Sequence, residues 1–225
     1  MFANIRADIY HYREYCFARR PIWQTLLILP YVHPASVAVA AYRYGYWAWH
    51  CPIPIVRHLA KLVYLLIMPW VRLYSGVQIQ PLTDIGPGLI ILHFGGVVLT
   101  KGCRVGANAI LHHNFNIVTT NTNKAAIIGD NFYAGVGASI VGNLIIEDNV
   151  VVGAGCVVTR SVPKDAIVGG VPARILRFRT TQERPPKIVV GNHEPAEFLE
   201  SPSRSDSPGT SPKDSASNVN AGERC

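Results

Sequence analysis

The residue of this chain whose chemistry is most evident is a histidine that stands just before a pair of glycines. His93 belongs to the segment 91–96, which reads Ile-Leu-His-Phe-Gly-Gly. Histidine suits the removal of a hydroxyl proton, because the pKa of an unperturbed imidazole is about 6.5. Gly95 and Gly96 would let the backbone approach a ligand closely, although glycine at a corner also simply makes a turn. A lone histidine is more often a satisfied structural residue, so both interpretations stay open on these residues alone.

The elements that must position this histidine are set by an internal repeat in the middle of the chain. From Ile79 to Val158, aliphatic residues recur every six residues, with one gap of eight and one of eleven. This period fits a coil of short strands joined by tight turns, whose stacked coils bury one aliphatic column. We therefore predict about five coils of three hexads each, with a protruding loop at Thr119–Ala126. The repeated positions are Ile79, Ile85, Ile91, Leu99, Val105, Leu111, Ile117, Ile128, Ala134, Ile140, Ile146, Val152 and Val158.

The segments on either side of the repeat have a different character. Residues 1–75 contain apolar residues without strand alternation, which predicts helices. Residues 178–225 are rich in Ser, Pro, Asn and Glu and nearly lack aromatic residues, which predicts a disordered tail. The predicted organisation is a helical region at 1–75, a solenoid domain at 76–177 and the tail. The predicted helices are Asp8–Ala18, Trp23–Trp49 with a break near Pro30–Pro34, and Pro54–Tyr74.

Composition and charge narrow the class of protein. The 225 residues are 49% hydrophobic and 16% charged, which excludes a wholly disordered chain. Residues 1–177 carry 15 Lys and Arg against 7 Asp and Glu, and such a basic body suggests an anionic partner, although no motif supports nucleic acid. Five cysteines without a CxxC spacing give neither a disulfide framework nor a zinc ribbon. Free thiols and the lack of a secretory signal make the cytoplasm the expected location.

Two apolar stretches in the helical region resemble membrane spans only in part. Residues 22–42 are nearly uncharged but are interrupted by two prolines and a histidine. Residues 62–71 are fewer than the roughly 20 residues that a span needs. A packed helical bundle is the expected structure. Peripheral contact with a membrane is the alternative, because the aromatic residues of 42–49 together with Arg43 would suit a membrane surface.

The repeat, the helices before it and several local segments together resemble the hexapeptide-repeat acyltransferases, and among them the serine acetyltransferases. The resemblance covers residues 5–178. It implies a left-handed parallel β-helix that forms a homotrimer, with acetyl-CoA as co-substrate bound between neighbouring subunits. The resemblance leaves two oligomeric states as alternatives, a homotrimer and a hexamer that forms through the helical region. The segments that carry the resemblance are Ala41–Arg43 with Trp47, Gly76–Pro81, Ile85–Leu89, His93–Val98, Val152–Pro163 and Gly169–Arg174.

The resemblance also implies roles for individual residues. His93 matches the catalytic histidine of the family, and Gln78 stands where the family has the aspartate that orients it. His113, Asn114 and Lys124 are expected to line the substrate pocket. Small residues would let the pantetheine arm of CoA lie against the backbone, and arginines would neutralise its phosphates unless they form an ordinary solvated face. The residues that match the CoA-binding positions are Val136, Ala154, Thr159, Arg160, Arg174 and Arg177.

The departures from the family pattern concern the acceptor of the acetyl group. Gln78 replaces the orienting aspartate, Leu92 replaces the carboxylate before the catalytic histidine, and the loop Thr119–Lys124 lacks the Arg-His pair that binds the carboxylate of serine. No Asp or Glu occurs between Glu14 and Asp84, so the serine ammonium would lack its charge partners. The expected acceptor is therefore a neutral hydroxyl, such as a sugar of a surface polysaccharide, and free L-serine is the alternative.

Two further function classes stay open. His93 and His113 each follow a repeated aliphatic position by two residues, so we expect them to stack on adjacent coils, as zinc-binding histidines do in the γ-class carbonic anhydrases. A third histidine is missing at Val136, the next stacked position, and a catalytic zinc needs three protein ligands, so no metal is expected. The other class is a non-catalytic scaffold built on an inactive transferase, which Gln78 and Leu92 would favour.

Overall fold

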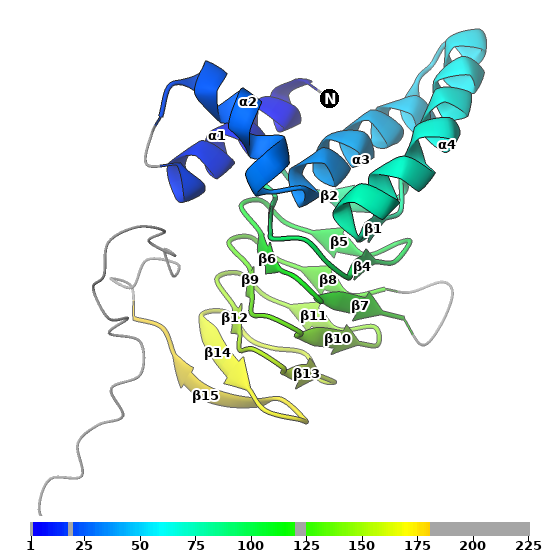
Figure 1. Ribbon diagram of the computed structural model, residues 1–225. Coiled ribbons are helices and arrows are strands. Elements are labelled where there is room, and N and C mark those ends of the chain that lie inside the picture. The colour runs from blue at the N-terminus through cyan, green and yellow to red at the C-terminus, as the bar shows by residue number, and fades with distance from the viewer. Residues whose placement is uncertain (1, 18–19, 120–124, 181–225) are drawn as a thin grey trace, which may run out of the picture. The chain divides into compact units, whose positions relative to one another are not determined.

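The computed structural model describes residues 2–17, 20–119 and 125–180 of the chain. In these ranges, four helices precede a solenoid of short parallel strands, which a β-hairpin closes (Figure 1). The predicted helices are confirmed, although the first begins earlier than predicted, and the predicted break falls at His33 and Pro34. The helices are α1 (Phe2–Cys16), α2 (Ile22–Val32), α3 (Ala35–His50) and α4 (Pro54–Ser75).

The strands are as short as a six-residue period requires. They are β1 (Val77–Ile79), β2 (Asp84–Ile85), β3 (Ile90–Leu92), β4 (Val97–Leu99), β5 (Arg104–Val105), β6 (Ile110–His112), β7 (Asn116–Val118), β8 (Ile127–Ile128), β9 (Tyr133–Ala134), β10 (Ser139–Val141), β11 (Ile145–Ile146), β12 (Val151–Val152), β13 (Val157–Val158), β14 (Ala166–Gly169) and β15 (Arg174–Phe178).

Consecutive strands belong to three different sheets, so three strands make one coil. The first sheet is ordered β1-β4-β7-β10-β13, the second β2-β5-β8-β11, and the third β3-β6-β9-β12-β14, with parallel neighbours throughout. Ile79 pairs with Leu99, so residues 79–99 make one complete turn of the solenoid. The eight-residue gap between Ile91 and Leu99 lies within that turn and does not interrupt the stacking. Four complete coils are followed by a partial fifth, in which Val162 forms a single bridge to Ile146. The predicted parallel solenoid is confirmed.

The interior of the solenoid is the aliphatic column that the repeat predicts. Each of the thirteen repeated positions is at most 3% exposed. Side chains two positions earlier fill the remaining space, as Phe115 and Phe132 do with ring centroids 5.8 Å apart. Cys103 and Cys156 are fully buried at equivalent positions. Burial of so many apolar side chains is the main force that holds the coils together.

The corner between the second and third sheets carries a ladder of three asparagine side chains and one aspartate side chain. Asn108, Asn131, Asn149 and Asp165 have φ angles of 55–60°, a left-handed conformation that Asn and Asp tolerate better than most residues. Their side chains are joined from coil to coil by hydrogen bonds of 3.2, 3.0 and 2.8 Å. The ladder therefore fixes this corner while the aliphatic column fills the interior.

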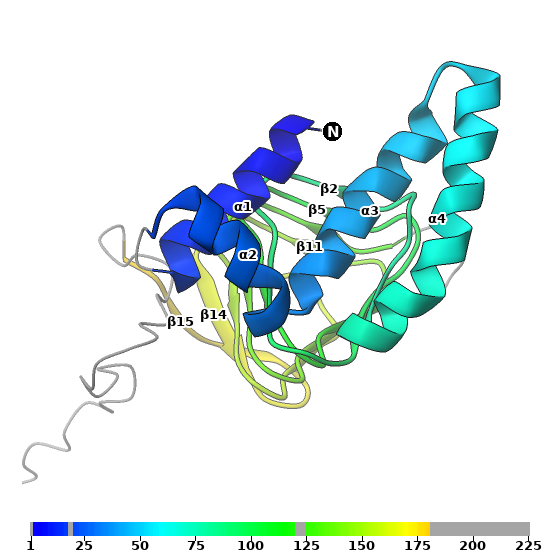
Figure 2. The same ribbon diagram turned by 45° about the horizontal axis from the view of Figure 1, so that its top comes forward.

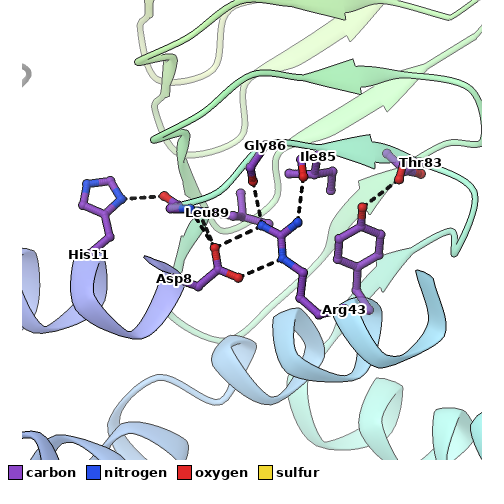
Figure 3. A network of polar contacts seen from close by, with 9 residues as sticks. Asp8, His11, Arg43, Thr83, Ile85, Gly86 and Leu89 are labelled. Atoms are coloured by element: carbon purple, nitrogen blue, oxygen red, sulfur yellow. Dashed lines mark hydrogen bonds and ion pairs between the residues drawn. The ribbon is translucent and has the colours of Figure 1, made fainter. Parts of the chain in front are cut away.

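Helices α1 and α3 lie over the first coil (Figure 2), and a buried ion pair fastens them to it (Figure 3). Asp8 and Arg43 are each 4% exposed, and Nε of Arg43 lies 2.8 Å from Oδ2 of Asp8. The guanidinium also donates to two carbonyl oxygens at the end of β2, while Oδ1 of Asp8 accepts the N–H groups of Gly88 and Leu89. The Ala-Tyr-Arg segment named in the resemblance thus joins the helical region to the solenoid.

A hairpin, which the sequence did not predict, closes the solenoid. β14 continues the third sheet in parallel with β12, and β15 returns antiparallel to β14. All five residues of β15 are exposed. β15 ends at Phe178, one residue beyond the predicted boundary, and the rest of the predicted tail from residue 181 lies outside the described residues. Residues 120–124, the centre of the predicted corner loop, lie outside them as well.

Judged by length and composition alone, one helix of the described ranges could cross a membrane. α4 has 22 residues, and its most apolar part has a mean hydropathy of 1.3 with only 22% of it buried inside the protein. α2 and α3 pass the same test when taken together, but the chain bends by 104° between them. The apolar stretch 62–71 is therefore part of a longer helix. Burial inside the protein does not account for the apolar composition of α4, because most of its apolar window is exposed.

Candidate active site

His93 lies at the corner where the third sheet leads into the first. It directly follows β3, its side chain is exposed, and its φ of 68° lies in the left-handed region. Because Leu92 pairs with His112, the next residues His93 and His113 stack on adjacent coils as predicted, with ring centroids 5.7 Å apart. The corner therefore presents the imidazole of His93 to solvent, supported by the coil beneath it.

Two further histidines complete a cluster around His93. The ring centroid of His112 is 6.3 Å from that of His93, and the centroid of His33 is 6.2 Å away. His33 comes from the break between α2 and α3 and packs against the rings of Tyr12 and Phe17. His33 is not among the site residues expected from the sequence, because helix packing and not periodicity brings it to the corner. The His-Pro pair inside an apolar stretch was the available signal.

The cluster holds hydrogen-bonding capacity that the protein does not use. Among the described residues, Nδ1 of His33 and Nδ1 of His113 are buried without a hydrogen-bond partner. An unsatisfied buried polar atom costs about 1–3 kcal/mol, so such atoms are rare and call for an explanation. Two of them beside one exposed histidine indicate a place that is built for function at some cost in stability.

Two of the histidines packed around His93, namely His33 and His112, are neutral near pH 7. Burial lowers the pKa of His33, and the nearby His93 lowers it further. Burial is the largest cause that lowers the pKa of His112 to about 4, and the nearby His93 and His113 lower it further. Burial also raises the pKa of Tyr133, so its hydroxyl keeps its proton and can donate to Nε2 of neutral His112 at 2.9 Å. Uncharged neighbours do not oppose a proton on His93, which suits a general base.

The glycines after His93 are required by the coil beneath them. A Cβ atom at Gly96 would lie 2.8 Å from Oδ1 of Asn114, a separation that would force a shift. Gly95 has a φ of 126°, and its N–H donates to the carbonyl oxygen of Ser75, the last residue of α4. Asn114, predicted to line the pocket, therefore lies at this corner. Lys124, predicted to do the same, lies outside the described residues.

Gln78 and Leu92 occupy the places where the resemblance has carboxylates. Gln78 is half-buried on β1, beside Val98. No hydrogen bond joins its side chain to His93 within the described part of the chain, so its orienting role stays a prediction. Leu92 is 3% exposed and belongs to an apolar cluster with Tyr12 between the helices and the third sheet. A carboxylate would not fit that environment without a partner.

Carboxylates from elsewhere in the chain are engaged by other groups. Asp8 is bound to Arg43, and Asp84 lies 3.6 Å from Nε of Arg104 on the second sheet. Four more accept hydrogen bonds from the coils, namely Asp130, Glu147, Asp148 and Asp165. An ammonium group beside His93 would therefore meet none of these six carboxylates in the same chain.

A row of exposed small residues continues from His113 along the same corner. The N–H of Gly137 donates to the carbonyl oxygen of His113, and the N–H of Gly155 donates to that of Val136. Val136 and Ala154 are both exposed. These contacts place the predicted CoA-binding residues Val136 and Ala154 on successive coils, in line with His113. A ligand that lies along the corner in an extended conformation would pass all three residues.

The predicted phosphate-binding residues lie towards the C-terminal end of the solenoid. Thr159 and Arg160 are exposed directly after β13, and Arg177 is exposed on β15. Arg174 lines a hollow of about 370 Å³ together with the turn of the hairpin and Leu176. The structure thus places Arg174 on a concave surface, and the contact of all four residues with CoA stays a prediction.

The histidine cluster is not arranged as a metal site. Within residues 2–17, 20–119 and 125–180, no group of three or more His, Cys, Asp or Glu side chains could hold a metal ion. His112 is engaged with Tyr133, and the ring centroids of the cluster lie about 6 Å apart. The chemistry that this arrangement can supply is that of a general base at His93.

Similarity to known proteins identifies the family. No family model matches the chain. Over 179 residues, which are 78% of this chain and 69% of the relative, the chain is 30% identical to the serine acetyltransferase of Synechococcus elongatus. This chain belongs to the serine acetyltransferase family. It is therefore an O-acetyltransferase, and acetyl-CoA is its co-substrate.

Solved structures of serine acetyltransferases have the same fold. Soybean serine acetyltransferase, solved in complex with serine, is 29% identical to this chain, with a TM-score of 0.65 over 77% of this chain and 68% of that one. A serine acetyltransferase solved in complex with CoA is 23% identical, with a TM-score of 0.64 over 77% and 68%. The predicted fold and reaction type are confirmed. These relatives favour serine over the sugar acceptor expected from the sequence.

Proposed function

We propose that this serine acetyltransferase family member transfers the acetyl group of acetyl-CoA to the hydroxyl of L-serine, with His93 as general base. The support for serine is the similarity to relatives named for that reaction, one of them solved with serine. The observation that supports His93 is its position, exposed at a corner and beside two imidazole nitrogens without hydrogen-bond partners. The sugar acceptor has no comparable support among these relatives.

His93 takes the hydroxyl proton as the serine oxygen attacks the carbonyl carbon of the thioester. Its imidazolium then returns that proton to the sulfur of CoA as the carbon–sulfur bond breaks, which leaves O-acetylserine, free CoA and a neutral His93. A positioned general base contributes about 10²–10⁴ in rate. Gln78 is proposed to accept an imidazole N–H through its amide oxygen. An amide stabilises imidazolium less than a carboxylate would.

CoA is proposed to lie along the row of small residues that begins below His113. The exposed Val136 and Ala154 leave room for the pantetheine arm against the backbone. The concave surface at Arg174 lies at the end of the solenoid where the phosphates would be bound. A homotrimer would cover this exposed row from a neighbouring subunit, and a hexamer would add contacts through the helices. The remaining residues proposed to bind the phosphates are Thr159, Arg160 and Arg177.

A second acceptor class, a neutral hydroxyl such as that of a sugar, is favoured by one specific observation. Leu92 lies in an apolar cluster, Gln78 carries no charge, and six carboxylates of the chain are engaged elsewhere. Burying the serine ammonium without a charge partner would cost several kcal/mol, on the order of the penalty for any unpaired buried ion. A sugar hydroxyl avoids this penalty because it carries no charge.

The test is a free-thiol release assay that compares L-serine with a panel of nucleotide sugars and oligosaccharides. Saturable turnover of L-serine that is lost in His93→Ala supports the proposal. His58→Ala, at an exposed histidine on α4, is the matched control and should retain full activity. Turnover of a saccharide but not of L-serine would replace serine by the second class. Undiminished turnover of the preferred acceptor in His93→Ala would remove His93 from the mechanism.

The cytoplasm is the proposed location of the enzyme. Cys16, Cys51, Cys103 and Cys156 are free thiols, the state that a reducing compartment maintains. Fractionation of the producing cell would test this location. We expect the protein in the cytoplasmic fraction or bound to the cytoplasmic side of a membrane, and recovery from any other fraction would contradict the proposal.

A further inference from the structure

The outer face of α4 is apolar but packs against no other described part of the protein. Its inner face is a narrow stripe of Ala60, Tyr64 and Met68, which pack together with Ala41 of α3. On the outer face, the most apolar residues lie three, four or seven positions apart, so helical geometry aligns them. They are Ile55, Leu59, Leu62, Leu66 and Leu73, with exposures of 81%, 62%, 53%, 65% and 75%.

This face exceeds what a soluble surface normally exposes. Single exposed apolar residues are ordinary, whereas a contiguous apolar patch along a helix marks an interaction surface. Trp70 and Tyr74 lie at its C-terminal end and are 73% and 45% exposed. Tryptophan and tyrosine are the residues that settle at the boundary between lipid and water. The same end of the helix is joined to α2, because the Tyr74 hydroxyl donates to the carbonyl oxygen of Pro30.

The charge beside the apolar face selects the partner. Lys61 and Arg72 fall on one flank of α4 by their spacing, and α4 contains no Asp or Glu. The sequence has no acidic residue from Tyr15 to Thr83, and the ammonium of Lys61 lies 4.8 Å from the ring centroid of Trp49 on α3. Anionic headgroups are the complement of an apolar helix face with a cationic flank. The α4 helix of a second copy would bring no carboxylate to these cations, because α4 contains no Asp or Glu.

We propose that α4 docks this protein on the surface of an anionic membrane, with its apolar face in the interface and its cations among the headgroups. α4 lies at the end of the solenoid opposite the closing hairpin, and it slants outward from the first coil beside α3 (Figures 1 and 2). It does not cross the bilayer, because α3 covers its inner stripe and Arg43 of α3 is held by Asp8 against the first coil. The proposal does not depend on the identity of the acceptor.

Docking would also bring the candidate active site close to the lipid surface. α4 ends at Ser75, whose carbonyl oxygen accepts the N–H of Gly95, two residues after His93. The helix that contacts lipid is therefore tied directly to the catalytic corner. Acetyl transfer would take place beside the membrane, whichever hydroxyl is the acceptor.

The test is co-sedimentation of the full chain with vesicles of phosphatidylcholine alone or of phosphatidylcholine mixed with phosphatidylglycerol. The full chain should bind the mixed vesicles, and added salt should weaken binding. Lys61→Ala with Arg72→Ala should lower the affinity about fivefold for each cation removed. The triple variant Leu59→Gln, Leu66→Gln and Leu73→Gln should reduce binding more than tenfold, and because these side chains are exposed, circular dichroism should show an unchanged fold.

A matched control replaces exposed apolar residues on the second sheet. Ile127→Gln with Ile145→Gln, at positions 45% and 55% exposed, should leave vesicle binding unchanged. Three results would overturn the proposal. The first is absence of binding to mixed vesicles, and the second is equal binding by the triple variant. The third is that the full chain does not bind vesicles but associates with itself, and that the triple variant abolishes this self-association. That result would make this face a contact between copies of the chain.

Discussion

Replacing Arg43 by methionine should loosen the helical region from the solenoid. The guanidinium makes two hydrogen bonds to Asp8, of 2.8 and 3.0 Å, and two of 2.6 Å to the carbonyl oxygens of Ile85 and Gly86. Methionine keeps much of the length and apolar volume of the side chain but removes all four donors. Asp8 would then remain buried with only the N–H groups of the turn after β2 as partners.

The loss of free energy of unfolding depends on the unpaired charge that each substitution leaves in the protein. Removing one partner of a buried ion pair leaves a charge without compensation, and this typically costs roughly 3–5 kcal/mol. Asp8→Asn should also destabilise the protein, because it leaves the buried guanidinium of Arg43 without its counter-charge, although the amide oxygen can still accept the two backbone N–H groups. The double variant should cost less than the sum of the two single variants, since it leaves no isolated charge.

Urea unfolding followed by circular dichroism would measure these differences, with Arg104→Met as the matched control. Arg104 lies 3.6 Å from Asp84, but both side chains are more than half exposed, so their pair should contribute about 0–1 kcal/mol. The reasoning fails if Arg43→Met is as stable as Arg104→Met. Strict additivity of the Asp8 and Arg43 changes would refute it equally, because it would show that the two groups do not interact.

Three further predictions concern the site. Gln78→Asp should raise kcat for acetyl transfer about tenfold, because a carboxylate stabilises an imidazolium at His93 better than an amide does, and Gln78→Asn should not raise it. Equal kcat values in thiol release would contradict the orienting role. His112 has a pKa of about 4 in the folded chain, below its unfolded value, so its contribution to stability is complete above about pH 6.5 and is lost as the pH falls towards 4. His112→Asn should flatten that loss in urea titrations at stepped pH, and an unchanged slope would exclude this histidine as its source. Arg160→Ala with Arg177→Ala should weaken CoA binding in calorimetry without unfolding the protein, and unchanged affinity would remove both residues from the CoA site.

The fold was predictable because a six-residue aliphatic period has one economical structural explanation. Every repeated position, from Ile79 to Val158, is buried, and the pairing of Ile79 with Leu99 shows how the irregular gap is absorbed. The asparagine ladder was predictable in principle, since Asn108, Asn131 and Asn149 each stand three residues after a repeated position. The hairpin β14–β15 was not, because nothing in its sequence distinguishes a returning strand from the start of a tail.

The candidate site was only half predictable, for a physical reason. His93 and His113 follow from the repeat, because residues at the same place in consecutive coils must stack. His33 does not, because its position depends on how α2 and α3 pack on the solenoid. The environment of Leu92 was hidden for the same reason, since Tyr12, Phe17 and Leu29 of its apolar cluster come from the helical region. What the repeat fixes is predictable, and what the helical region adds is not.

The helical region therefore belongs to the catalytic corner as much as the solenoid does. It touches that corner at two places: the ring of His33 lies 6.2 Å from the ring of His93, and Ser75 accepts the N–H of Gly95. A tilt of the helices would change both contacts at once. It would also disturb the end of the solenoid core, because Ala38, Val39 and Tyr42 of α3 belong to the same apolar cluster as the interior of the coils. The ion pair of Asp8 and Arg43 limits that tilt, since it clamps α1 and α3 to the first coil. Loss of that ion pair should therefore lower acetyl transfer even in molecules whose solenoid remains folded.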